Sequence, residues 1–175
     1  MVGGAGSATL MTRRTVGAPI TFNGVANVLP INFTNVVTVN GSSVTSNNTL
    51  YQRVEGTDVI SYGTSFMQPG PAGQGEVKTT YNPPVRDRSA SLAVGESQNL
   101  VYNEITQLSA TATTSNSYTS QITYLGQEAT SVPAGSFDAC KFQNAMAGTT
   151  TTGWTAKGSG VLVRSVNSEG TLQLK

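Results

Sequence analysis

Apolar positions along this chain recur with a period of two, the spacing of a half-buried β-strand, and no long window shows helical spacing. In "NVVTVNGSSVT", Val37 and Val39 fall on one face, and the Asn-Gly pair at 40–41 tolerates the positive φ of a type I′ turn. "TLYQRVEGTDVISYG" repeats this pattern around the Glu-Gly pair at 55–56. We therefore expect two consecutive β-hairpins in the first third of the chain.

The second half contains further strand candidates that are separated by Gly, Asn or Pro. Consecutive strands at this spacing predict an antiparallel meander. A helix could lie within 89–103, but Gly95 and the lack of a capping residue argue against a long one. The strand candidates are 98–114, 117–132, 136–146, 149–166 and 170–175.

Between these halves, "QPGPAGQGEVKTTYNPPVRDRS" is rich in proline and glycine. Proline removes backbone donors and glycine loosens the chain, so we expect a loop around 68–75 and 82–90. A short strand at 76–81 interrupts it. A functional loop and a plain linker across the end of a sheet explain this segment equally well.

Composition supports an all-β fold. The chain has 175 residues, of which 11% are charged and 37% are hydrophobic, and Thr, Ser, Asn, Gln and Gly take the place of charge. Thr, Val, Tyr and Ile suit pleated surfaces, whereas the Lys and Glu common on helices are scarce. We expect a single β domain over 10–175 with little or no helix, preceded by a flexible tether over 1–9. An ordinary frayed terminus or a cloning remnant explains 1–9 equally well.

Charge and hydropathy argue against nucleic-acid partners, although a local patch is not excluded, and against a membrane-spanning helix. The net charge of +1 gives no field that would gather phosphate backbones, so nucleic-acid binding is disfavoured. No apolar run approaches the roughly 20 residues of a membrane helix, and the first residues lack the order of a signal peptide.

The residue types needed for most catalysis are missing. The sequence has no histidine and one cysteine, which removes Ser-His and Cys-His pairs and Cys/His zinc sites. A carboxylate pair could in principle come from the nine acids, but most lie beside glycine or in expected turns, where solvated charges are usual. We expect no enzyme and no catalytic, cofactor-binding or metal-binding residue. The acids are Glu55, Asp58, Glu76, Asp87, Glu96, Glu104, Glu128, Asp138 and Glu169.

Three local features have plain interpretations. Arg13-Arg14 and Arg86-Asp87-Arg88 are expected to end strands and keep sheet edges soluble. Cys140 lies just beyond an expected turn with no reactive neighbour, which favours a buried small hydrophobe. An intermolecular disulfide is the alternative for an exposed, secreted Cys140.

"YLGQEATSVPAGSFDACKF" and "GWTAKGSGVLVRSV" together resemble a family of bacterial extracytoplasmic proteins and lipoproteins of unknown function. The resemblance covers about the last third of the chain. It rests on a Gly-x-Glu, a Val-Pro-Ala-Gly-x-Phe-Asp segment, a Trp and a Lys-Gly-x-Gly. The matching residues are Gly126, Glu128, Val132, Pro133, Ala134, Gly135, Phe137, Asp138, Lys141, Trp154, Lys157, Gly158, Gly160, Val161 and Val163.

The resemblance implies a curved, partly open β-barrel or half-barrel and an extracytoplasmic location, whether periplasmic, outer-membrane anchored or secreted. It also implies a lipid anchor in a precursor, and it supplies no catalytic set. A proline followed by a glycine suits a turn between two strands. We therefore interpret the motif as a signature of the fold, carried by Gly126, Glu128, Pro133, Gly135, Phe137, Trp154, Gly158 and Gly160.

Two functions from different classes fit the sequence. The first is a non-catalytic extracytoplasmic β domain that binds an apolar small molecule or a protein partner, because several strands carry apolar residues on both faces. The alternative is a structural or adhesive surface subunit that self-associates through strand edges, which the low charge and abundant Thr and Asn suit. Closely spaced buried acids in a cleft would instead favour an enzyme.

Overall fold

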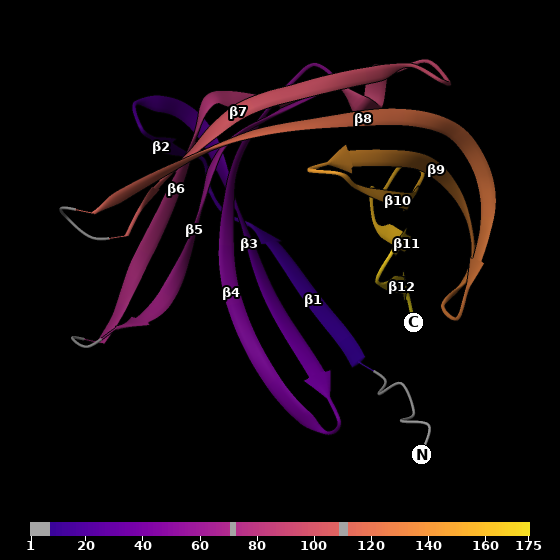
Figure 1. Cartoon of the computed structure of the whole chain (residues 1–175), viewed down its shortest axis with the longest axis horizontal. Coiled ribbons are helices and arrows are strands. Elements are labelled where there is room, and N and C mark those ends of the chain that lie inside the picture. Colours follow the sequence, from indigo (N-terminus) through magenta and orange to yellow (C-terminus); the bar gives the residue numbers. More distant parts are fainter. Residues whose placement is uncertain (1–7, 71–72, 109–111) are drawn as a thin grey trace. The chain divides into compact units, whose positions relative to one another are not determined.

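The computed structural model describes residues 8–70, 73–108 and 112–175, and nearly all of them lie in strands (Figure 1). The only helical element in these residues is one 3-10 turn, η1 (Ser89–Ser91), and none of their helices has the length and apolar character to cross a membrane. The all-β prediction is therefore confirmed. The strands are β1 (Ala8–Val16), β2 (Ile20–Phe22), β3 (Val25–Val39), β4 (Ser42–Glu55), β5 (Asp58–Gly70), β6 (Gly73–Asp87), β7 (Ser97–Gln107), β8 (Thr113–Val132), β9 (Gly135–Met146), β10 (Thr149–Ala156), β11 (Leu162–Asn167) and β12 (Gly170–Gln173).

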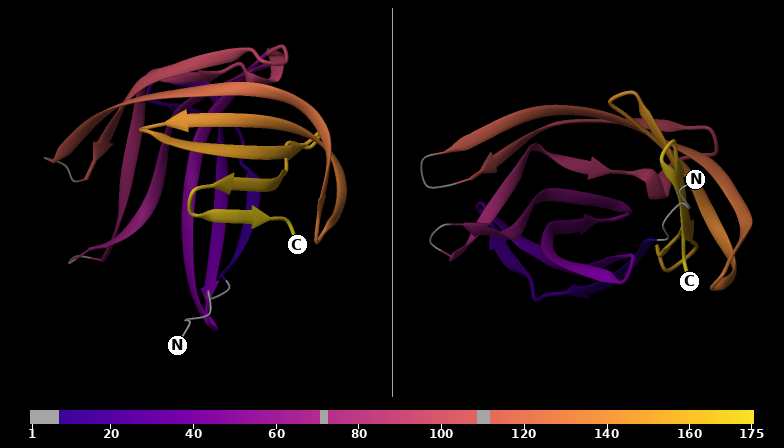
Figure 2. Two further views of the ribbon diagram at one scale, coloured as in Figure 1. Left: turned by 45° about the vertical axis from the view of Figure 1, so that its right-hand side comes forward. Right: turned by 60° about the horizontal axis from the view of Figure 1, so that its bottom comes forward.

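The strands follow one another in the sheet in chain order. The order is β1-β3-β4-β5-β6-β7-β8-β9-β10-β11-β12, with β2 paired to β3 off this path. This is a linear path with two ends, so the sheet among the described strands is not closed into a barrel. The predicted antiparallel meander is confirmed, and Figure 2 shows β9 to β12 as successive neighbours.

The expected hairpin turns are present. Asn40 and Gly41 have φ of 50° and 80°, as a type I′ turn requires, and they join Val39 to its partner Ser42. β4 ends at Glu55, and Gly56 and Thr57 form the turn to β5, one residue later than the Glu-Gly pair around which this hairpin was expected. Pro133-Ala134 join Val132 to its partner Gly135. These turns fix the register of the long hairpins.

The proline- and glycine-rich segment differs from its prediction. Strand β6 spans Gly73–Asp87, so the expected short strand at 76–81 is only its middle part, and β5 continues to Gly70. Proline loses one amide donor but keeps a φ that a strand accepts, which lets Pro83 and Pro84 lie within β6 after a cis Asn82–Pro83 peptide. Residues 71–72 lie outside the described residues.

The expected tether over 1–9 also changes. Residues 1–7 lie outside the described residues, and Ala8 and Thr9 belong to β1.

The described chain divides into two compact units. Unit 1 holds the described residues of 1–53, 60–84 and 104–115, and unit 2 holds 54–59, 85–103 and 116–175.

Unit 1 has a small aromatic core. Phe22, Val28, Ile60 and Tyr62 are buried, and Tyr51 packs against them with its ring 4.1 Å from that of Phe22, centroid to centroid. Stacked rings bury a large apolar area in a fixed geometry. In unit 2 the buried apolar side chains among the described residues are those of Ala139, Trp154 and Val163.

Gly63 lets two strands of unit 1 approach closely. A Cβ at this position would lie 2.1 Å from the carbonyl oxygen of Thr79. We predict that Gly63→Ala lowers the free energy of unfolding by about 1–3 kcal/mol, because backbone atoms must move to relieve the overlap. Chemical denaturation monitored by circular dichroism measures this change.

Gly75→Ala is the matched control, because a Cβ there meets nothing within 4 Å. It lies on β6, the strand that contains Thr79. Equal stabilities of the two variants would contradict the assigned close approach.

Candidate functional site

Part of the predicted signature assembles into one row across unit 2. Gly126 of β8 pairs with Lys141 of β9, Lys141 pairs with Trp154 of β10, and Trp154 pairs with Arg164 of β11. Directly paired residues share a face of a sheet. The row therefore brings residues that are far apart in the sequence onto one surface of four neighbouring strands.

Glu128 lies two residues beyond Gly126 and joins this row through its carboxylate. Trp154 Nε1 donates to Glu128 Oε1 at 2.5 Å, and Lys141 Nζ lies 3.4 Å from Glu128 Oε2. These contacts lower the pKa of Glu128 below its ordinary value; the hydrogen bond from Trp154 is the main cause, and Lys141 and Arg164 add to it.

The ring of Trp154 holds two cations near it. Lys141 Nζ lies 5.1 Å and the guanidinium carbon of Arg164 lies 4.9 Å from the ring. Trp154 is only 7% exposed, so these contacts are partly shielded from water and a cation–π attraction is strengthened. The contacts of the Trp154 cluster (Glu128, Lys141, Trp154 and Arg164) join four strands. Its single carboxylate lies among two cations, and the buried Nε of Arg164 makes no hydrogen bond among the described residues.

The other signature residues lie at turns. Pro133, Gly135 and Phe137 flank the β8–β9 turn, and Gly158 and Gly160 lie in the β10–β11 turn with φ of 81° and 64°. The structure therefore separates the signature into one side-chain cluster and two turns. The signature expected from the sequence does not include Arg164, because its place in the cluster depends on the β10–β11 register.

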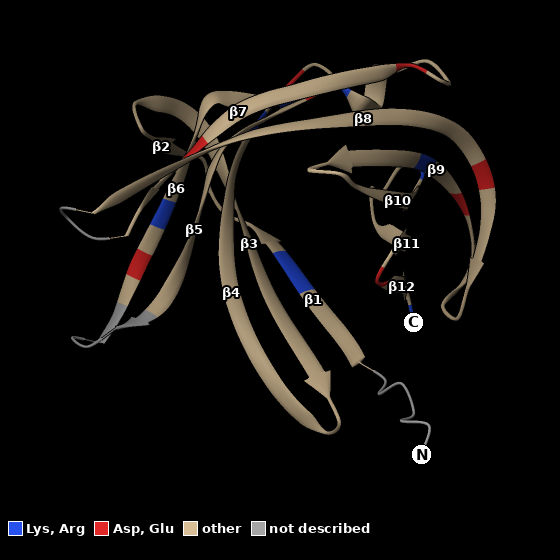
Figure 3. Ribbon diagram, in the orientation of Figure 1, with Lys and Arg blue, Asp and Glu red and all other residues tan. Residues whose placement is uncertain are grey.

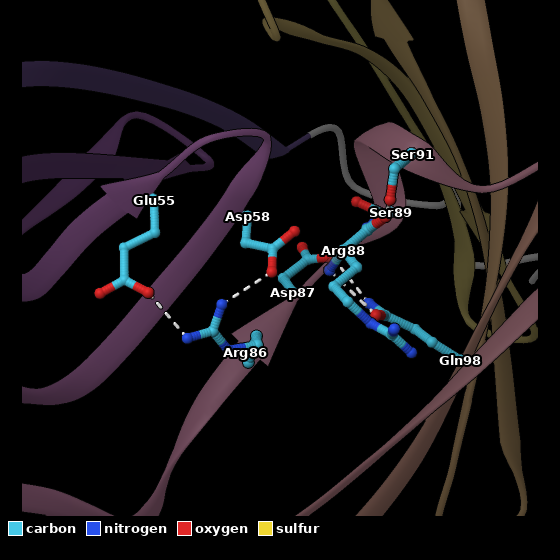
Figure 4. A network of polar contacts seen from close by, with 8 residues as sticks. All are labelled: Glu55, Asp58, Arg86, Asp87, Arg88, Ser89, Ser91 and Gln98. Atoms are coloured by element: carbon cyan, nitrogen blue, oxygen red, sulfur yellow. Dashed lines mark hydrogen bonds and ion pairs between the residues drawn. The ribbon is translucent and has the colours of Figure 1, made fainter.

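A second polar network surrounds Arg86 (Figure 4). Arg86 donates to Asp58 Oδ2 and to Glu55 Oε2, each at 2.8 Å, and so holds the two ends of the β4–β5 turn. Next to it, Asp87 Oδ1 accepts from Gln98 Nε2 at 2.7 Å and from the amide of Ser89 at 2.8 Å. This network engages its carboxylates in holding strands together.

Of the two charge clusters that were expected to end strands, one does and the other does not. β6 ends at Asp87, as expected for Arg86-Asp87-Arg88. Arg13 and Arg14 lie in the middle of β1 rather than at its end, so the prediction that they end a strand is wrong. Figure 3 shows how few charges the strands of the described chain carry.

Cys140 is a free thiol on β9 and is half-buried rather than buried as expected. Nearby Tyr124 has its pKa raised, chiefly by its partial loss of hydration and secondly by the Cys140 side chain. Cys140 lies directly opposite Gln127 of β8 and Thr155 of β10, which share its face and leave it half-buried. In the described part of the chain no cluster of three or more acidic or cysteine side chains could hold a metal ion.

Unit 1 contains two open hollows that meet at the stacked pair Phe22–Tyr51. The apolar hollow has a volume of about 250 Å³ and is lined by Phe22, Asn23, Val25, Tyr62, Thr80, Tyr81, Asn82, Pro84 and Ile105. The polar groove has a volume of about 350 Å³ and is lined by Asn32, Phe33, Thr34, Asn47, Asn48, Thr49, Tyr51, Ser65, Phe66, Met67 and Glu76. Sequence reasoning did not find either one, because their walls come from several separate strands.

Comparison with protein-family models, with curated proteins and with solved structures gives no match for this chain. The resemblance of its last third to bacterial extracytoplasmic proteins stays a prediction.

The lowered pKa of Glu128 makes a pH-dependent contribution to stability. A folded-state pKa below the ordinary value of 4.5 stabilises the fold above that pH, and the contribution is lost as the pH falls through the folded-state pKa. We predict that Glu128→Gln lowers the Tm at pH 7 and that the difference from wild type shrinks in acid. Thermal melts between pH 7 and pH 3 measure it.

Glu104→Gln on β7 is the matched carboxylate-to-amide control, outside the Trp154 cluster. A Tm difference for Glu128→Gln that is the same at every pH would contradict the assigned role of its charge.

Proposed function

We propose that this protein is a non-catalytic, extracytoplasmic β domain that binds a small apolar ligand in the apolar hollow of unit 1. The observation that carries the proposal is the hollow itself, which opens beside the Phe22–Tyr62 core. The extracytoplasmic location is proposed from the family resemblance.

The lining and volume of the hollow define the ligand. Six of its side chains are apolar or aromatic: Phe22, Val25, Tyr62, Tyr81, Pro84 and Ile105. Its volume of about 250 Å³ lies below the roughly 300–1,000 Å³ of sites for drug-sized molecules. The ligand is therefore about as large as a single ring or a pair of fused rings.

Two polar side chains at the hollow, those of Asn23 and Thr80, have partners within the protein. Asn23 Nδ2 donates to Thr80 Oγ1 at 2.9 Å, and Asn23 Oδ1 accepts from Lys78 Nζ at 2.9 Å. Lys78 Nζ also lies 4.3 Å from the ring centroid of Phe22. Because these groups already form hydrogen bonds within the protein, an apolar molecule can enter the hollow without leaving them unpaired.

The non-catalytic part of the proposal is supported by how the carboxylates are used. Glu55 and Asp58 bind Arg86, and Glu128 binds Trp154 and Lys141. A general acid or base needs access to a substrate, and these groups are committed to contacts between strands.

We predict that indole or 2-naphthol binds in the apolar hollow and that Ile105→Thr weakens this binding about five- to tenfold. The substitution removes apolar contact but keeps a β-branched side chain that suits a strand. Amide chemical-shift titration by NMR gives the dissociation constants.

Val101→Thr is the matched control: it lies on the same strand, β7, is 65% exposed and does not line the hollow. The apolar-ligand proposal would be overturned if neither indole nor 2-naphthol binds, or if Ile105→Thr and Val101→Thr weaken the binding equally.

A second candidate function, assembly through a strand edge, is favoured by β1. It is the first strand in the sheet order, all nine of its residues are exposed, and its only described partner is β3. An edge of this length offers a row of unpaired backbone groups to another strand. The occupant that we propose is β1 of a second copy, in a two-fold antiparallel pair.

The side chains of β1 suit self-pairing centred on Thr12. In that register Leu10 faces Arg14 of the other copy and Met11 faces Arg13, so no arginine faces an arginine. An apolar patch (Leu10, Val37, Val39 and Val44) lies beside this edge on one face of β1, β3 and β4. Pairing would place the two patches on one continuous sheet.

We predict a concentration-dependent dimer in sedimentation equilibrium, and at least a tenfold weaker dimer for Met11→Lys. Lysine at this position would face Arg13 of the second copy, and like charges directly opposite are destabilising. Met11 is 71% exposed, so the folded monomer should tolerate the change.

Val101→Lys adds the same charge to a 65% exposed position away from this edge and should leave the dimer unchanged. A strict monomer at high protein concentration would rule out the assembly.

A further inference from the structure

We propose that the polar groove of unit 1 binds a neutral saccharide. This site is separate from the apolar hollow and shares no lining residue with it; Tyr51 of the groove stacks on Phe22 of the hollow.

The floor of the groove is set by the register of β3 and β4. Asn32 pairs with Thr49, and Thr34 pairs with Asn47. Residues two apart on a strand share a face, so these four side chains form one polar square. Tyr51 continues the same face two residues beyond Thr49.

The polar square has unused hydrogen-bonding capacity. Thr49 Oγ1 donates to Asn32 Oδ1 at 2.9 Å, which leaves the amide donors of Asn32 free. Asn47 is exposed, and its side chain and that of Thr34 make no hydrogen bond with the described residues. An asparagine amide offers one acceptor and two donors side by side, which can pair with two neighbouring hydroxyl groups.

Apolar side chains stand beside these amides. Tyr51 is held by a 3.0 Å hydrogen bond between its hydroxyl and that of Ser65, and Met67, two residues beyond Ser65 on β5 and therefore on the same face, is 50% exposed. A sugar ring has C–H groups on one face and hydroxyl groups around its rim. An aromatic wall next to an amide square therefore matches both of its surfaces.

The charge of the groove selects a neutral ligand. Its lining contains no lysine or arginine, and the one side chain in it that is charged at neutral pH is the carboxylate of Glu76. A phosphate, nucleotide or acidic sugar would meet Glu76 without a compensating cation. The volume of about 350 Å³ suits one or two sugar rings.

An extended peptide fits the groove less well. The β3–β4 ladder is continuous from Leu29 to Val39, so the floor presents no free backbone edge for strand addition. A peptide would depend on side-chain contacts alone.

The experiment is saturation-transfer-difference NMR with cellobiose, maltose and N,N′-diacetylchitobiose as neutral probes. We expect transfer to the ring C–H protons of at least one probe, and an amide-shift titration then gives its dissociation constant. Asn47→Ala should weaken this binding at least tenfold, and it removes no side-chain hydrogen bond among the described residues.

Asn144→Ala, an exposed asparagine on β9 of unit 2, is the matched control and should leave binding unchanged. Ile105→Thr should also leave it unchanged, which separates this result from that of the apolar hollow. Three outcomes would each overturn the proposal. They are the absence of transfer to every neutral probe, unchanged binding by Asn47→Ala, and binding of 3′-sialyllactose or tetra-alanine as strong as that of the neutral saccharide.

Discussion

Backbone hydrogen bonding between strands that follow one another along the chain is the interaction on which this fold depends. Among the described residues eight apolar side chains are buried, whereas eighteen large apolar side chains are exposed, so burial alone supplies limited stabilisation. Each ladder bond contributes about 0.5–1.5 kcal/mol net, and the strands contain many of them. Cross-strand pairs such as Trp154 with Lys141 and Arg164 then add side-chain contacts to a register that the backbone has already fixed.

The local part of this arrangement could be predicted from the sequence. Positive φ at Asn40 and Gly41 is a property of two adjacent residues, and the period of two beside them defines which side chains share a face. Prolines misled the prediction for β6, because a proline excludes a hydrogen-bonded central position but not an extended backbone. Whether a given amide is needed depends on the neighbouring strand, which the local sequence does not contain.

The candidate sites show the same limit. Glu128 and Trp154 were recognised as signature residues, yet their contact joins two strands that have β9 between them. Arg164 completes that cluster through the register of another hairpin, and the hollows of unit 1 collect side chains from still more strands. Side-chain type and spacing indicate what a residue can do. The register decides which residues it meets, and register errors of one position move every side chain to the opposite face.

This dependence on register links the two proposed surfaces of the β3–β4 hairpin. Asn32 and Thr34 face the polar groove, and Val37 and Val39 belong to the apolar patch on the other face of the same strand. Substitutions at alternate positions can therefore change one surface without altering the other. A slip of one residue at the Asn40-Gly41 turn would instead place β4 side chains on the wrong face and disrupt both surfaces together. The Asn40-Gly41 turn belongs to neither surface. Saccharide binding in the groove and self-assembly beside the apolar patch nevertheless both depend on it.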